Sequence, residues 1–127
     1  VQAGGGTLGD AVYRELGVPV EPALALLAGV VSRPAPDRVV LDAGRKTIDP
    51  SARPPTPQDL DILDISFSAE HARLRLARPA DSPRVGDRLL LDVGYHDQAV
   101  HLHDAIFAVR DGLIEAVWPV AARGRLQ

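Results

Sequence analysis

The chain has 127 residues, a length sufficient for one domain with a buried core. Its formal net charge is -3 and only 4% of its residues are aromatic, which argues against a nucleic-acid partner. The absence of cysteine excludes disulfide and thiolate chemistry and fits a cytoplasmic protein, and no apolar run approaches the roughly 18 residues of a membrane span.

The N-terminal segment predicts a glycine turn followed by a short helix. Gly4, Gly5 and Gly6 form a stretch of high backbone freedom. Thr7 stands three residues before Asp10, as in a capping box, and the following apolar residues recur at helical spacing up to position 16. A glycine-rich loop that opens a helix can bind phosphate through free N–H groups, although an ordinary turn and helix explains the same pattern.

From position 19 onward the pattern is that of strands. One segment alternates apolar residues at 72, 74 and 76 with arginines at 73 and 75, and Asp111-Gly112 is a two-residue hairpin signal. The proline-rich segment 47–59 is predicted to be a loop. We therefore expect a mainly β fold, a small antiparallel barrel or sandwich. The predicted strands are 23–31, 38–43, 62–67, 72–78, 88–93, 101–110 and 113–118.

Three of the four histidines and two aspartates lie within residues 94–104. An extended backbone would place Tyr95, Asp97, Ala99, His101 and His103 on one face, since side chains alternate with period two. Imidazole and carboxylate together suit zinc or manganese. The same histidines could instead line a polar edge or accept hydrogen bonds in the core, and spacing alone leaves both interpretations open.

Other catalytic motifs are missing from the chain. It contains neither a G-x-S-x-G elbow nor a Walker loop. Lys46 is the only lysine, so Schiff-base chemistry within this chain would have to use it. A single lysine in a turn after a strand is more often a solvated side chain.

Several strings of residues occur in a familiar order along nearly the whole chain. They are Val1-Gln2-Ala3-Gly4, Asp10 with Tyr13, Val30-Val31-Ser32-Arg33-Pro34, Asp42-Ala43-Gly44-Arg45-Lys46, Glu70-His71, Gly86-Asp87-Arg88 and Val117-Trp118-Pro119-Val120-Ala121-Ala122-Arg123-Gly124-Arg125. With these strings the chain resembles the D-threonine aldolase/D-serine dehydratase-like family. The chain also contains no methionine, so we expect it to be part of a longer protein.

The resemblance implies a two-domain parent enzyme built like alanine racemase. A (β/α)8 barrel holds pyridoxal phosphate on a lysine near the N-terminus, and a C-terminal β-domain completes the active site. Residues 1–18 would be the end of the barrel, with Gly4, Gly5 and Gly6 near the cofactor phosphate, and residues 19–127 would be the β-domain. Because the barrel lysine is absent here, the isolated chain is expected to be inactive. The expected partners are its own barrel, a second subunit and a D-amino-acid substrate.

The family also implies a divalent metal, bound by a His-x-Cys or His-x-Asp pattern that continues with Thr and Asn at alternate positions. This pattern falls on Tyr95, Asp97, Ala99 and His101. Asp97 matches the carboxylate ligand, whereas the other three positions depart from the pattern. His96 or His101 could replace the missing histidine. Gly6 likewise stands where many members have tyrosine.

Three hypotheses about function follow from the resemblance. The first is a metal-assisted D-amino-acid lyase, an aldolase, dehydratase or deaminase, with Asp97, His96 and His101 as candidate metal ligands. The second is a metal-independent isomerase or racemase-like enzyme in which Tyr95 acts as the catalytic acid or base. The third is that the chain serves only as a structural and dimerisation module.

Overall fold

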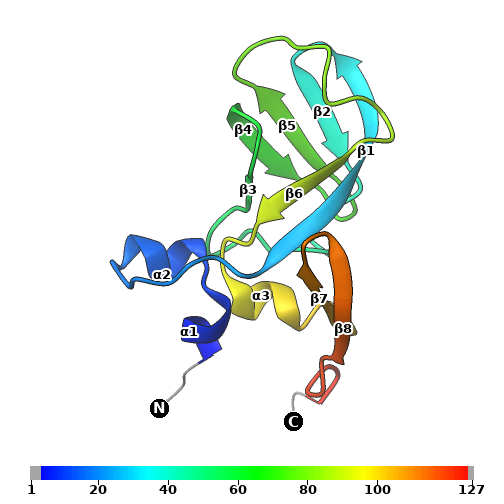
Figure 1. Cartoon of the computed structure of the whole chain (residues 1–127). Helices are drawn as coiled ribbons and strands as arrows, with labels where there is room; N and C mark the ends of the chain where they lie inside the picture. The colour runs from blue at the N-terminus through cyan, green and yellow to red at the C-terminus, as the bar shows by residue number, and fades with distance from the viewer. Residues whose placement is uncertain (1–3, 126–127) are drawn as a thin grey trace.

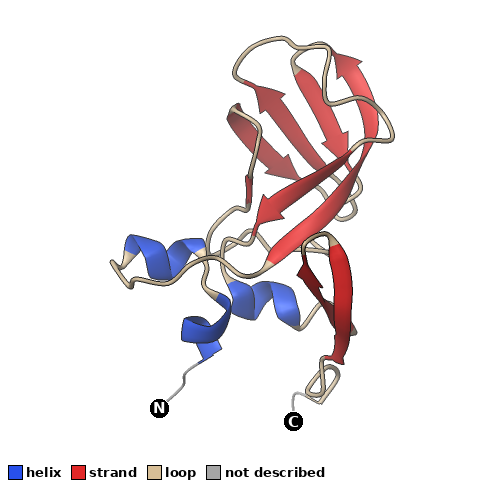
Figure 2. Cartoon of the chain, viewed as in Figure 1, coloured by secondary structure: helices blue, strands red, loops and turns tan. Residues whose placement is uncertain are grey.

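A six-stranded antiparallel sheet dominates the computed structural model, which describes residues 4–125 (Figures 1 and 2). Its strand order is β3-β6-β1-β2-β5-β4, and the sheet curls into a nearly closed barrel (Figure 1). A second sheet consists of β7 and β8 alone. The helices are α1 (Gly4–Leu8), α2 (Ala11–Glu15) and α3 (His96–Val100), and the strands are β1 (Ala25–Ala35), β2 (Arg38–Leu41), β3 (Thr56–Pro57), β4 (Ile62–Phe67), β5 (Ala72–Leu76), β6 (Arg88–Asp92), β7 (Ala105–Arg110) and β8 (Leu113–Pro119).

Strand alternation produces the barrel core. The alternation predicted for β5 is confirmed, because Ala72, Leu74 and Leu76 are buried and the arginines between them are exposed. β5 pairs with β2, whose Val39 and Leu41 are fully buried, and Leu91 of β6 closes the same cluster. The mainly β fold predicted from the sequence is thus confirmed, and of the two expected architectures, barrel and sandwich, the structure has the nearly closed barrel. No helix among residues 4–125 has the length and apolar character needed to cross a membrane.

β1 is longer than the sequence predicts. The prolines after position 33 were expected to end it, yet the strand continues to Ala35. Its first half pairs with β6 over Ala25–Gly29, and its second half pairs with β2 through bulges. Pro34 lies beyond the region paired with β6, where the missing N–H is tolerated because no strand needs it on that side.

β7 and β8 form the predicted hairpin around Asp111 and Gly112. Both turn residues have positive φ, 50° and 77°, as a type I′ turn requires. β7 begins at Ala105, so the predicted start at position 101 was wrong. Apolar side chains remain exposed on this ribbon, among them Phe107, Val109, Ile114, Val117 and Trp118.

The N-terminal segment contains two short helices in place of the single helix predicted. Gly4, Gly5 and Gly6 lie in α1 and do not form a turn. Gly9, with φ of 60°, separates the two helices, and Asp10 caps α2. The predicted capping box starting at Thr7 was therefore wrong. A left-handed residue cannot continue a helix, and Asp10 is itself a favourable N-cap.

Residues 96–100 form α3, so the extended backbone considered for this stretch was wrong. His96 and Ala99, three positions apart, are both buried, which is helical spacing. Asp97 lies in the first turn, where a negative charge is favourable, and Gln98 and Ala99 are good helix formers. Ala99 packs with Ile48 and Val93 in a second apolar cluster. This helix, and not a strand, positions the histidines and aspartates.

Candidate functional site

His96 lies at the first position of α3 and is 5% exposed. Its Nδ1 is 2.5 Å from Oδ2 of Asp10, which also accepts a hydrogen bond from the backbone N–H of His96 at 3.0 Å. On the opposite side of the ring, Nε2 is 2.9 Å from Oδ1 of Asp97. The imidazole is therefore held between two carboxylates, one buried and one exposed.

Asp10 is a buried carboxylate whose two oxygens are both engaged. Oδ1 accepts the N–H of Tyr13 at 2.9 Å and so caps α2, while Oδ2 faces His96. Burial on its own would raise the pKa of Asp10, but the hydrogen bonds from Tyr13 and His96 together outweigh it and leave this pKa below its ordinary value. Asp10 is thus held as an anion in the interior.

Tyr95 and Asp97 extend the cluster toward solvent. The Tyr95 hydroxyl donates a hydrogen bond to Oδ2 of Asp97 at 2.8 Å, and the Asp97 side chain is 63% exposed. That hydrogen bond, with the negative charge of Asp97, raises the pKa of Tyr95 above its ordinary value. The phenol therefore stays protonated at neutral pH and serves as a hydrogen-bond donor.

Two aromatic rings fix the plane of the His96 imidazole. The Tyr13 ring centroid is 5.8 Å from that of His96 at an interplanar angle of 37°. The Tyr95 ring lies edge-on at 5.6 Å and 67°. Asp10, Tyr13, Tyr95, His96 and Asp97 together form what we call the His96 cluster.

The other histidines of the stretch do not join this cluster. His101 is exposed, and its Nδ1 lies 2.9 Å from the backbone oxygen of Asp97, one helical turn earlier. His103 is directed elsewhere, with Nε2 2.8 Å from the backbone oxygen of Thr47. Of the predicted metal ligands, the structure brings His96 and Asp97 side by side and leaves His101 at the carbonyl of Asp97.

The sequence analysis also singled out Gly6 and Lys46 as possible cofactor contacts. Gly6 has open space around it, since an added Cβ would meet no atom within 4 Å. Lys46 is exposed and paired with Glu70. This solvated lysine does not fit a Schiff base with pyridoxal phosphate, so the chain provides no covalent anchor for that cofactor.

His96 Nε2 and Asp97 Oδ1 are the two atoms of the His96 cluster that could hold a divalent ion together. Two ligand atoms at about 2.1 Å from one ion lie about 3 Å apart when their bonds meet at right angles, and the Nε2–Oδ1 distance is 2.9 Å. A carboxylate behind the imidazole, as Asp10 is, typically orients a ligating histidine. Residues 4–125 contain no group of three histidine or acidic side chains that could hold an ion. Further ligands would have to be water, substrate or another part of the polypeptide.

Sequence reasoning missed the role of Asp10 and Tyr13. Both were noted only as parts of a resemblance and of a helix. Asp10 and His96 are 86 positions apart, so no local spacing links them. A usable signal was the Gly9-Asp10 pair, which ends one helix and caps the next.

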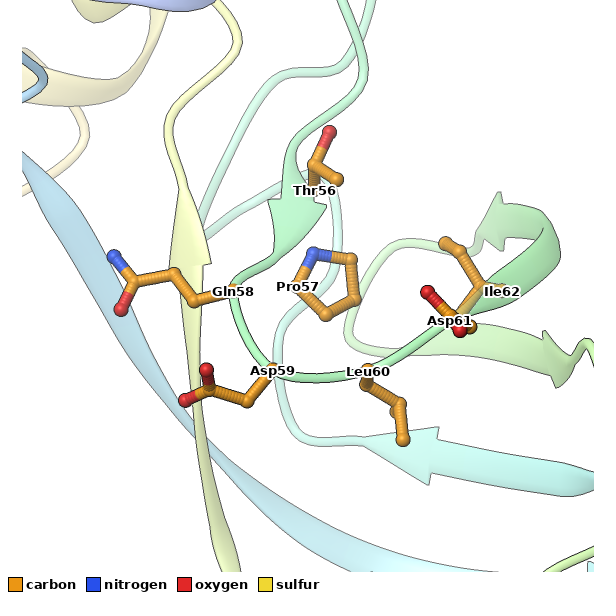
Figure 3. A pocket seen from close by; sticks show the side chains of 7 residues that line it. All are labelled: Thr56, Pro57, Gln58, Asp59, Leu60, Asp61 and Ile62. Carbon is orange, nitrogen blue, oxygen red and sulfur yellow. The ribbon is translucent and has the colours of Figure 1, made fainter.

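A shallow pocket elsewhere, between β3 and β4, contains none of the predicted site residues. Its lining side chains come from one continuous connection and include no histidine or basic group (Figure 3). They are Thr56, Pro57, Gln58, Asp59, Leu60, Asp61 and Ile62.

Comparison with known families gives a match over most of the chain. Residues 23–109 match the family described as "Putative serine dehydratase domain". The chain belongs to this family. The match includes β1 to β6, α3 and nearly all of β7, and therefore Tyr95, His96 and Asp97.

Individual relatives agree with this assignment. The chain is 38% identical over 105 residues to a D-threonine aldolase of Arthrobacter, covering 82% of this chain and 28% of the aldolase. It is 37% identical over 108 residues to a 3-hydroxy-D-aspartate aldolase of Paracoccus denitrificans, covering 83% of this chain and 27% of that enzyme. A crystal structure of D-threonine aldolase from Filomicrobium marinum superimposes with a TM-score of 0.83 at 30% identity, over 93% of this chain and 34% of that one. The chain thus spans about a quarter to a third of each of these proteins.

Proposed function

We propose that this chain is the β-domain of a pyridoxal-phosphate-dependent D-amino-acid lyase of the aldolase or dehydratase type. Its membership of the serine dehydratase domain family and its similarity to two aldolases support this function. The observation that carries the proposal is the pairing of His96 Nε2 with Asp97 Oδ1 at 2.9 Å, backed by Asp10. The cofactor would be held by another part of the polypeptide, because Lys46 is paired with Glu70 at the surface.

In this proposal His96 and Asp97 would hold a zinc or manganese ion that acts on the β-hydroxyl of the substrate. When bound, such an ion supplies Lewis-acid polarisation of that hydroxyl, and pyridoxal phosphate supplies an electron sink at the α-carbon. The contribution of the chain is orientation: Asp10 and the two tyrosine rings fix the imidazole, and α3 fixes Asp97 beside it. The Tyr95 hydroxyl donates a hydrogen bond to the Asp97 carboxylate and so holds that carboxylate in place.

Metal content and activity of wild type, Asp97→Ala and His101→Ala test this function. The protein should carry the barrel, be supplied with manganese, and be given D-threonine and D-serine. We expect wild type to bind stoichiometric metal and to convert D-threonine into glycine and acetaldehyde, or D-serine into pyruvate and ammonia. Asp97→Ala should lose the metal, whereas His101→Ala should keep it because His101 is turned toward a backbone carbonyl. A wild type that leaves every D-amino acid unchanged would exclude a lyase.

A metal-independent isomerase is the second candidate, because the hydroxyl of Tyr95 lies in the same cluster as His96 and Asp97. In that enzyme Tyr95 would exchange a proton with the substrate. Activity that survives a strong chelator but is lost in Tyr95→Phe would favour this candidate. Activity that is abolished by the chelator and restored by manganese would favour the lyase.

The proposal also includes two protein partners, the barrel of the same polypeptide and a second subunit. The exposed apolar side chains of β7 and β8 support a partner of some kind. Sedimentation at micromolar concentration tests the homodimer, which a purely monomeric species would contradict.

A further inference from the structure

Asp10 makes more contacts than an N-cap requires. One side-chain oxygen is sufficient to accept the N–H that a cap satisfies, and serine or asparagine would do this about equally well. At Asp10 the oxygen Oδ1 performs this task with Tyr13. The second oxygen is directed at a residue 86 positions later, where it contacts both the backbone N–H and Nδ1 of His96. The second set of contacts requires another explanation.

The backbone of the N-terminal segment fixes where this carboxylate lies. The N–H of Ala11 donates to the oxygen of Val93 at 3.5 Å, and that of Val12 donates to the oxygen of Gly94 at 3.3 Å. These groups belong to the first turn of α2, whose N–H groups have no partner within the helix. The start of α2 is thus joined to the chain immediately before His96, and the side chain of Asp10 is 0% exposed.

A carboxylate at this position determines which nitrogen of His96 carries hydrogen. An ionised carboxylate only accepts, so Nδ1 must donate to it. In the neutral ring Nε2 then has a free lone pair, and that lone pair faces Oδ1 of Asp97 at 2.9 Å. Two acceptors at this distance repel each other unless a proton or a metal cation lies between them. The contact of Asp10 with Nδ1 therefore leaves two acceptor atoms, Nε2 and Oδ1 of Asp97, that face each other on the other side of the ring and can share a proton or a cation.

We infer that Asp10 is a positioning residue for His96: it holds the imidazole with hydrogen on Nδ1, so that Nε2 and Asp97 face each other as a pair of cation acceptors. This deepens the proposed function and rests on it only in treating the Nε2 side as the functional one. Tyr13 and Tyr95 assist by holding the ring plane.

The test compares wild type with Asp10→Asn by nitrogen-15 NMR of the histidine rings, without added metal. The asparagine amide can still cap α2 through its oxygen. Its N–H group takes the place of Oδ2, and this donor favours an Nδ1 that carries no hydrogen and accepts a hydrogen bond. We expect His96 Nδ1 to carry hydrogen in wild type and to lose it in Asp10→Asn. His103, which contacts Thr47, is the internal control and should be unchanged. A bare Nδ1 in wild type, or an unchanged His96 in the variant, would overturn the inference.

If Asp10→Asn does not fold, Asp10→Ser replaces it, because serine caps the helix but is too short to reach His96. The ring should then carry its hydrogen on Nε2, which still faces the acceptor oxygen of Asp97, whereas a role confined to capping predicts no change at His96. Titration with manganese alone provides a second readout. Removing the carboxylate that accepts a hydrogen bond from the non-ligating nitrogen of a metal-binding histidine typically weakens metal affinity by about 10- to 100-fold, so the Asp10 variant should bind manganese that much more weakly than wild type. If wild type binds no manganese, the metal-assisted function is contradicted. The positioning role of Asp10 is then decided by the NMR result alone. Equal affinity in both proteins would overturn the positioning role alone.

Discussion

At the scale of single residues, Asp10 makes stability depend on pH. Its pKa is lowered by hydrogen bonds from Tyr13 and His96, against the opposing effect of burial. A lowered folded-state pKa means that the carboxylate stabilises the fold above the unfolded-state value of about 3.9, and that this stabilisation is lost as the pH falls through the lower folded-state pKa.

We therefore expect Asp10→Asn to reduce the free energy of unfolding at neutral pH by about 1 to 3 kcal/mol, because a buried N–H loses its acceptor. The difference from wild type should shrink as the pH falls below the unfolded-state pKa of about 3.9 and through the lower folded-state pKa. Urea unfolding at several pH values measures it, with the exposed Asp59→Asn as the control. A difference that is independent of pH would contradict an ionised Asp10.

Tyr95 provides a second prediction at this scale. The carboxylate of Asp97 accepts a hydrogen bond from the Tyr95 hydroxyl and repels the phenolate, and both effects raise the pKa of Tyr95 above its ordinary value of 10.0. Asp97→Asn removes the negative charge and should lower that pKa. Ultraviolet absorbance of tyrosinate follows the titration, and Tyr13→Phe leaves Tyr95 as the only tyrosine, since the chain contains two. Asp104→Asn, whose carboxylate contacts Arg123, should have no effect.

At the scale of elements, the β6–α3 connection is packed so closely that Gly94 cannot carry a side chain. A Cβ there would lie 1.9 Å from the backbone oxygen of Arg53. We expect Gly94→Ala to destabilise the fold by about 1 to 3 kcal/mol, because backbone atoms have to move.

The matched control is Gly6→Ala, where an added Cβ meets nothing within 4 Å. Gly6 lies in α1, and alanine in a helix is favoured over glycine by about 1 kcal/mol, so this variant should be neutral or slightly stabilised. Urea unfolding compares the two. Equal stability of the two variants would show that the approach of Arg53 to Gly94 is not rigid.

The elements differ in how well their sequence predicts them. β5 and the β7–β8 turn were predicted because their signals are local: alternation at Leu74 and its neighbours, and the Asp111-Gly112 pair, whose residues both have positive φ in the structure. α3 was not, because the histidines and aspartates of that stretch have no strong apolar period. Its helical form depends on burying Ala99 against Ile48 and Val93, which only the assembled fold provides.

At the scale of the whole molecule, the N-terminal segment is attached to the barrel sheet by polar contacts. Residues 4–18 contribute no buried or partly buried side chain to either apolar cluster. They are held by Asp10 on His96, by Arg14 near Asp92 at 3.7 Å, and by Glu15 paired with Arg53. Residues 4–18 are thus a polar attachment to an apolar barrel, and the domain boundary at position 18 stays a prediction.

We expect a chain that begins at Pro19 to keep the six-stranded sheet while α3 loses protection, because the apolar core lies entirely within the retained part. Hydrogen exchange measures both in one experiment. Slow exchange should persist at Leu74 and Leu91, whereas amides of residues 96–100 should exchange faster than in the longer chain. Global unfolding of the shortened chain would show that the polar attachment is essential for the fold.

The amino-acid sequence alone was sufficient to predict the mainly β fold, most strand positions, the hairpin and the family. Alternation, turn chemistry and ordered strings of residues are local properties that can be read without the tertiary structure. The family match over residues 23–109 agrees with them. The tertiary structure decided how the site is built. Asp10 reaches His96 across 86 positions because α2 docks beside Gly94, and a helix brings His96 Nε2 and Asp97 together where a strand would have put them on opposite faces. Contacts between distant segments depend on the path of the whole chain, and no period in the sequence encodes them.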